Sequence, residues 1–114
     1  MRRYTVRAVA SGQEIARTSD ALLIEGNFYF PSHDVISEAL EPARLRTLCV
    51  WKGIARYQHV IVNGERISHG AWVYPLPLPW AWFVKGRVAF DVTQGIDVVQ
   101  ESTQTDINSR ENRG

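Results

Sequence analysis

The sequence predicts a mainly β domain. Short segments rich in β-branched and aromatic residues are separated by turn dipeptides, and Asn63-Gly64 is the strongest hairpin signal among these turns. Only the segment at about 32–40 has apolar residues at helical spacing. A chain of 114 residues can bury one core without disulfides or metal, so we expect a single β-rich domain over 1–100.

Composition and charge argue against several kinds of partner. The formal net charge of +1 gives no electrostatic reason to expect nucleic acid or an anionic membrane as a partner. The one cysteine excludes an intramolecular disulfide, and three scattered histidines do not form a cluster typical of a metal site. The N-terminus lacks the apolar run of a signal peptide, and no apolar stretch reaches the roughly 18 residues of a membrane span. We therefore expect a cytoplasmic protein with no metal and no cofactor.

Four strands are expected in the first part of the chain. The run 21–24 is wholly apolar, which is typical of a buried strand, and Gly26-Asn27 supplies a turn after it. The aromatic run that follows is ended by Pro31. The expected strands are 4–9, 14–18, 21–24 and 28–30.

One short α-helix is expected at about 32–40. Ser32 is a residue type that caps helix N-termini, and Asp34 would lie in the first turn, where the helix dipole favours an anion. Apolar residues at roughly helical spacing follow, and Pro42 would end the helix.

Two hairpins are expected in the second half of the chain. Asn63-Gly64 would form the turn of the first hairpin, which is irregular around His69-Gly70, and Gln94-Gly95 the turn of the second. A Lys-Gly pair precedes each hairpin, which suits two related hairpins in two sheets packed or splayed against each other. The expected strand pairs are 55–62 with 66–74 and 88–92 with 96–100.

Two further segments are expected to lie outside the sheets. Prolines at every second position of 75–79 exclude helix and sheet pairing there, and stiff backbone of this kind can present Trp80 and Trp82 at a defined angle. The last segment, 101–114, has the polar composition typical of a disordered tail.

The candidate catalytic residues are Cys49 and Glu25. Cys49 could be a nucleophile or redox thiol activated by Lys52; the alternative is a small buried hydrophobic residue. Glu25 follows an apolar strand and precedes a glycine, so its carboxylate could act as an acid or base at a pocket edge. It could equally pair with Arg56 or Lys52 for structural reasons.

The candidate ligand-binding residues surround this cysteine in the sequence or join it through the expected hairpins. Lys52 could orient an anionic group, and the rings could supply contact area for a flat or cationic ligand; the alternative is a small core of large rings. The candidates are Lys52, Trp51, Tyr57, Trp72, Tyr74 and Arg56.

Five motifs occur in series along the chain: Ile24–Pro31, Cys49–Gly53, Asn63-Gly64, Ala71–Pro75 and Val84–Phe90. Together they resemble the family known as domain of unknown function 427. The resemblance implies two antiparallel β-meanders set like the sides of a tent, an architecture shared with zinc-binding domains and methionine sulfoxide reductase B. The zinc cysteines of those relatives have no counterpart here, and Val50 stands where the family usually has proline. The family has also carried a nucleotidyltransferase-like label, for which this sequence has no paired-carboxylate metal motif.

Two functions follow as expectations. The first is a domain that binds a small ligand in a pocket between the two sheets. This ligand could be anionic, and the domain could also catalyse a reaction on it. The second is a protein-interaction or homodimerisation module that uses the Pro/Trp segment 75–82, because exposed tryptophans there would mark a contact surface.

Overall fold

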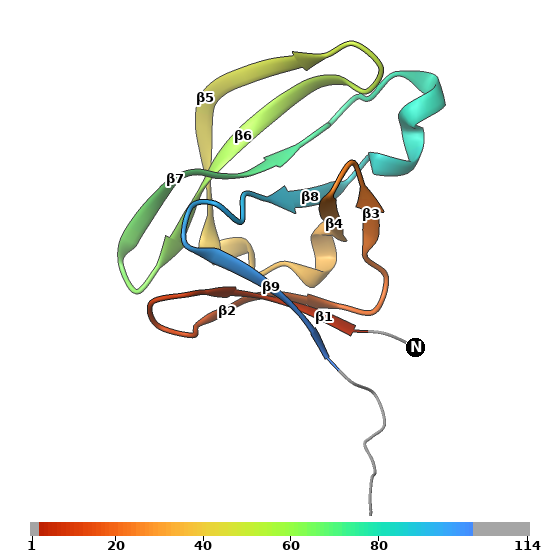
Figure 1. Ribbon diagram of the computed structural model, residues 1–114. Coiled ribbons are helices and arrows are strands. Elements are labelled where there is room, and N and C mark those ends of the chain that lie inside the picture. The colour runs from red at the N-terminus through yellow and green to blue at the C-terminus, as the bar shows by residue number, and fades with distance from the viewer. Residues whose placement is uncertain (1–2, 102–114) are drawn as a thin grey trace, which may run out of the picture.

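Two antiparallel sheets form the protein, which confirms the predicted β class (Figure 1). The computed structural model describes residues 3–101. The small sheet has the order β2-β1-β9, and the large sheet has the order β3-β4-β8-β7-β6-β5. The strands are β1 (Arg3–Ala8), β2 (Glu14–Thr18), β3 (Leu22–Ile24), β4 (Asn27–Pro31), β5 (Leu40–Cys49), β6 (Gly53–Val62), β7 (Glu65–Val73), β8 (Arg87–Phe90) and β9 (Ile96–Glu101).

The main core fills the space between the two sheets. Phe30 of β4 and Phe90 of β8 meet edge to face there, with ring centroids 5.9 Å apart. The small sheet contributes buried aliphatic side chains, among them Val6 and Ile15, to the same cluster. The side chains of this cluster are apolar and buried, so their removal from water stabilises the contact between the two sheets.

A second core lies on the other face of the large sheet. Side chains alternate along a strand, so Tyr29 and Ala89 point away from the main core while their neighbours Phe30 and Phe90 point into it. All six strands of the large sheet supply side chains to this second cluster, including Leu22 of the edge strand β3 and Cys49 of the opposite edge strand β5. The large sheet is therefore curled, and this face is its concave face.

The two tight hairpins of the large sheet use left-handed turns. Asn63 and Gly64 have φ values of 52° and 76° between β6 and β7, which confirms the predicted hairpin. Glu25 and Gly26 have φ values of 54° and 81° between β3 and β4. The turn therefore begins one residue earlier than expected, and Glu25 holds a conformation that costs a residue with a side chain about 1 kcal/mol or more.

The segment at 32–40 is not one α-helix. It forms two 3-10 turns, η1 (Ser32–Asp34) and η2 (Ser37–Ala39), separated by Val35 in extended backbone at φ −107° and ψ 137°. Val35 bridges Ala16, and the Ile36 amide donates to the Ile15 carbonyl at 2.8 Å. Pairing with β2 in this way stabilises an extended backbone more than local helix propensity favours a helix. No helix among residues 3–101 is long and apolar enough to cross a membrane.

The predicted hairpin across Gln94-Gly95 is also wrong. β8 pairs with β4 and β7 in the large sheet, whereas β9 pairs with β1 in the small sheet. Phe90 ends β8 in the large sheet and Ile96 begins β9 in the small sheet, and both side chains are buried in the main core between the sheets. The chain therefore crosses from one sheet to the other between these two residues. The internal similarity between the two Lys-Gly segments therefore does not extend to two equivalent hairpins.

Three smaller expectations differ from the structure. The apolar strand β3 lies at a sheet edge and Leu23 is 61% exposed, so this strand is not buried. Pro79 opens a third 3-10 segment, η3 (Pro79–Val84), in a stretch where no helix was expected, since proline fits the first position of a helical turn. Glu101, expected to begin the tail, closes β9; the rest of the predicted tail, 102–114, lies outside the described residues.

Replacing Phe30 with alanine is expected to lower the free energy of unfolding by about 3–5 kcal/mol, because Phe30 is fully buried in the main core. Urea unfolding measures this change. The exposed Leu23→Ala variant serves as the control and should stay within about 0.5 kcal/mol of the parent protein. Equal losses in the two variants would contradict this assignment of the core.

Candidate functional site

Two hairpin tips from opposite edges of the large sheet meet on its concave side. Cys49 pairs with Gly53, so Val50, Trp51 and Lys52 form the tip of the β5–β6 hairpin. The Trp51 indole N–H donates to Glu25 Oε2 at 3.1 Å, and the Lys52 ammonium donates to Glu25 Oε1. We call Glu25, Trp51 and Lys52 the clasp, because they connect edge hairpin β3–β4 to edge hairpin β5–β6.

Lys52 is buried, which is unusual for a lysine. Its side chain is only 4% exposed, and its ammonium lies 4.5 Å from the centre of the Trp51 ring and 5.5 Å from that of Tyr74. Burial acts to lower the pKa of Lys52, but the hydrogen bond to Glu25, followed by the nearby Tyr74 and Tyr29, raises this pKa above its usual value. The clasp therefore holds a positive charge inside the curl of the sheet.

Glu25 is the exposed partner of this buried cation. Its hydrogen bonds from Lys52 and then from Trp51 lower the pKa of the carboxyl group below its ordinary value of 4.5. The left-handed backbone at Glu25 places this carboxylate at the turn where both donors reach it. Backbone strain of this kind is often found at functional sites, where surrounding interactions maintain it.

Cys49 lies half-buried beside the clasp. Burial acts to raise the pKa of the thiol, but hydrogen bonds from the backbone amides of Trp51 and Lys52, together with the Lys52 ammonium, lower it below its usual value. The same three donors would stabilise a thiolate, which is the nucleophilic form of cysteine. Cys49 also packs against the second core, so it contributes to packing as well.

Two tyrosines complete the polar groups near the thiol. Burial raises the pKa of Tyr74 to about 12, and it raises the pKa of Tyr29 as well. The Tyr29 hydroxyl accepts a hydrogen bond from the Trp72 indole at 3.3 Å. Tyr74 is only 5% exposed, and among residues 3–101 its hydroxyl has no hydrogen-bond partner. Its O–H is therefore available as a donor to a bound group.

Trp72 and Tyr57 form an aromatic wall on the same face. Their rings are tilted by 37° with centroids 5.9 Å apart, and both residues are half-buried against the second core. They therefore pack against the second core and also leave part of their ring surface accessible.

The structure brings most of the predicted site residues together, although not in the expected place. Glu25, Cys49, Trp51, Lys52 and Tyr74 converge around one ammonium group, with Trp72 and Tyr57 beside them. They lie on the concave face, whereas the space between the two sheets is filled by the main core.

Arg56 does not join this site, and Tyr29 was missed. Arg56 is exposed on β6 and alternates with Ala55 and Tyr57, which face the second core. The alternation in Phe28-Tyr29-Phe30 could have identified Tyr29, because it puts one hydroxyl group alone on the face opposite to two phenylalanines. Among the residues that the structure describes, no three His, Cys, Asp or Glu side chains come together as a metal site would require.

The clasp predicts a specific dependence of stability on pH. Because folding lowers the pKa of Glu25, the ionised pair stabilises the fold fully above pH 4.5, and this contribution is lost as the pH falls through the lowered pKa. Urea unfolding of the parent protein and of Glu25→Gln should therefore converge as the pH drops below 4.5. Glu65→Gln, which changes an exposed residue of the Asn63-Gly64 hairpin, is the control. A constant difference between Glu25→Gln and the parent protein at all pH values would contradict the role of the ionised pair.

Comparison with known proteins agrees with the resemblance seen in the sequence. A search of curated proteins found no match. The model of one family, described as a domain of unknown function, DUF427, matches residues 2–102 and so includes every residue of the clasp and Cys49. The chain belongs to the DUF427 family.

Proposed function

We propose that this domain binds a small molecule on its concave face and that Cys49 acts on it as a nucleophilic thiolate. The observation that carries the proposal is the position of half-buried Cys49 at the hairpin tip that also holds the buried Lys52 ammonium. The amides of Trp51 and Lys52 and this ammonium act to lower the pKa of the thiol. Such surroundings are typical of reactive cysteines, whereas cysteines in apolar surroundings have raised pKa values. The cytoplasm, where disulfides are rare, would keep such a thiol reduced.

The groups around the sulfur suit a ligand with an electrophilic carbonyl carbon. The sulfur would add to that carbon, a C–S bond would form, and the electron pair of the C=O bond would move onto oxygen. The Tyr74 hydroxyl and the Lys52 ammonium are the donors that could stabilise the resulting negative charge. Trp72 and Tyr57 would supply apolar contact area for the rest of the molecule.

Thiol labelling across a pH range tests this proposal. The labelling rate of Cys49 with iodoacetamide should reach half its maximum at a pH below the value of about 8.5 that is usual for a free thiol. Lys52→Met should move this midpoint upward, because it removes the neighbouring charge while keeping most of the side-chain volume.

Lys85→Met is the matched control for Lys52→Met. Lys85 also precedes a glycine and lies 4.5 Å from the centre of a tryptophan ring, but that ring belongs to Trp82 on an exposed surface. This variant should leave the labelling midpoint unchanged. A midpoint at or above that of a free thiol in the parent protein would refute the nucleophilic role of Cys49.

We also propose a second candidate function, self-association through an exposed apolar patch. Four large side chains between Leu76 and Phe83 are at least half exposed: Leu76 at 76%, Trp80 at 65%, Trp82 at 50% and Phe83 at 50%. Large apolar side chains exposed together within one short segment are typical of protein interfaces. The Trp80 indole donates to the Trp51 carbonyl at 2.7 Å, so Trp80 also supports the clasp.

Sedimentation velocity of the double variant Trp82→Ser/Phe83→Ser tests the second candidate without disturbing Trp80. If the patch joins two copies, the parent protein should sediment as a dimer at concentrations where the variant is a monomer. Leu23→Ser, which removes an apolar side chain exposed elsewhere, should behave as the parent does. A parent protein that stays monomeric throughout the concentration series rules out this interface.

A further inference from the structure

One face of β6 continues beyond the reach of the small sheet. Val60 and Val62 point from this face into the main core. Side chains alternate along the strand, so Ile54 and Arg56 share the face of Val60 and Val62, nearer the clasp end of β6. Ile54 and Arg56 are both exposed, which leaves an uncovered stretch of sheet on the side opposite to the concave face.

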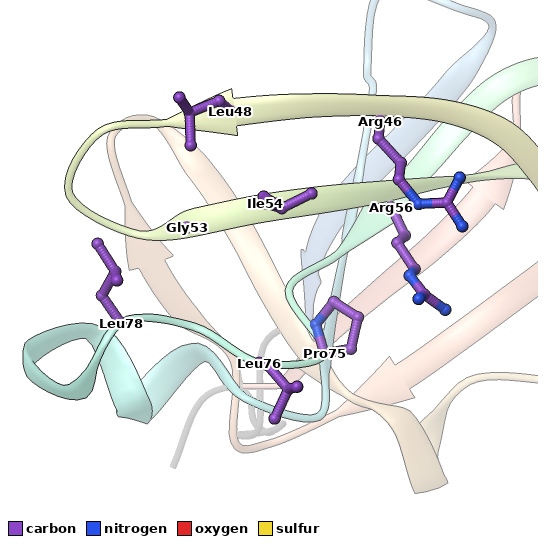
Figure 2. A pocket seen from close by; sticks show the side chains of 8 residues that line it. All are labelled: Arg46, Leu48, Gly53, Ile54, Arg56, Pro75, Leu76 and Leu78. Carbon is purple, nitrogen blue, oxygen red and sulfur yellow. The ribbon is translucent and has the colours of Figure 1, made fainter.

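A groove runs along this uncovered stretch (Figure 2). Its volume is about 430 Å³, which lies within the range of roughly 300–1,000 Å³ typical of small-molecule sites. The β5–β6 hairpin forms one wall, and the segment that follows β7 forms the other. The lining residues are Arg46, Leu48, Gly53, Ile54, Arg56, Pro75, Leu76 and Leu78.

The second wall is held in place by backbone contacts. The Leu78 amide donates to the Lys52 carbonyl at 2.8 Å. Gly53 has φ of 119°, and a side chain at this position would lie 3.4 Å from the Pro77 Cα atom. That distance is an ordinary van der Waals contact, so glycine is favoured at the start of β6 by its positive φ and not by lack of space. The 75–78 segment therefore packs directly against the hairpin tip.

Two arginines occupy one end of the groove. Arg46 and Arg56 are direct partners across the β5–β6 ladder, and Figure 2 shows their guanidinium groups extending side by side. Like charges in directly opposite positions destabilise a sheet. No carboxylate among residues 3–101 forms an ion pair with either arginine, and none lines the groove. The positive charge at this end therefore has no counterpart within the described chain.

The rest of the groove is apolar. Leu48 is 72% exposed and Leu76 is 76% exposed, and Ile54 and Leu78 lie beside them. Exposed apolar side chains next to a cation pair match a ligand with an apolar chain and an anionic end. A carboxylate or phosphate oxygen pair fits the planar donor geometry of guanidinium groups, and the apolar part would cover the leucines and Ile54.

We propose that this groove binds a small amphipathic anion, a carboxylate or phosphate monoester with an apolar chain or ring. Its anionic group contacts Arg46 and Arg56, and its chain lies toward Leu48 and Leu76. The groove lies on the opposite face of β6 from Cys49, so this proposal is independent of the thiolate chemistry. An anionic lipid surface offers the same headgroup chemistry, but a recessed groove with two cations suits a single soluble molecule better.

Calorimetric titration of the protein with octanoate tests the proposal. We expect saturable binding of octanoate, and each of Arg46→Gln and Arg56→Gln should weaken it about tenfold, because each removes charge-assisted hydrogen bonds. Both arginines are exposed, so these substitutions leave the core intact. Arg44→Gln is the matched control, because Arg44 is exposed on the same strand but does not line the groove; it should bind octanoate as the parent does.

Varying the length of the ligand's apolar chain tests whether that chain contacts the apolar part of the groove. Shortening octanoate to hexanoate should weaken binding to the parent protein by several-fold per methylene, and this dependence should be smaller in Ile54→Ser. Octanol binding as tightly as octanoate would overturn the anion assignment. Failure of octanoate to bind, whether or not vesicles containing phosphatidylglycerol bind, would overturn the small-molecule site.

Discussion

The ion pair between Lys52 and Glu25 is the interaction on which the concave face of the large sheet depends. Together with the hydrogen bond from Trp51 to Glu25, it joins hairpins from the two opposite edges of a six-stranded sheet, which also share the second core. An unpaired ammonium at this depth would be strongly unfavourable, because burial removes its hydration. Glu25 keeps the charge stable there, and the charge in turn acts to lower the pKa of Cys49. Packing, electrostatics and the reactivity proposed for the thiol therefore depend on the same contact.

The two faces of the large sheet have different roles. The face toward the small sheet carries aliphatic and phenylalanine side chains that form the main core. The concave face carries tyrosine, tryptophan, lysine and cysteine, whose polar atoms remain next to ring surface. Because the alternation along each strand separates the two sets, one face forms the main core, and the groups of the proposed chemistry lie on the other. Glu25 has a strained left-handed backbone, and this conformation places its carboxylate at the clasp.

The features that the sequence predicted correctly are those that depend on neighbouring residues along the chain. The strands on either side of Asn63-Gly64 and the grouping of Glu25 with Cys49 and Lys52 followed from turn preference and residue type. The α-helix predicted at 32–40 was wrong, because pairing with Ile15 and Ala16, which are distant in the sequence, stabilises an extended backbone there. The curl of the large sheet, which brings its two edges together, arises from long-range strand order and has no local signal. The same holds for the pairing of Arg46 with Arg56, since Arg46 belongs to a strand that the sequence did not predict.

A double-mutant cycle on the clasp tests the central claim most directly. The free energy of unfolding is measured at neutral pH for the parent protein, Glu25→Gln, Lys52→Met and the double variant. If the pair connects the two edges of the sheet as described, the double variant will lose less stability than the sum of the two single losses. Additive losses would mean that Lys52 and Glu25 stabilise the fold independently, and would contradict the clasp.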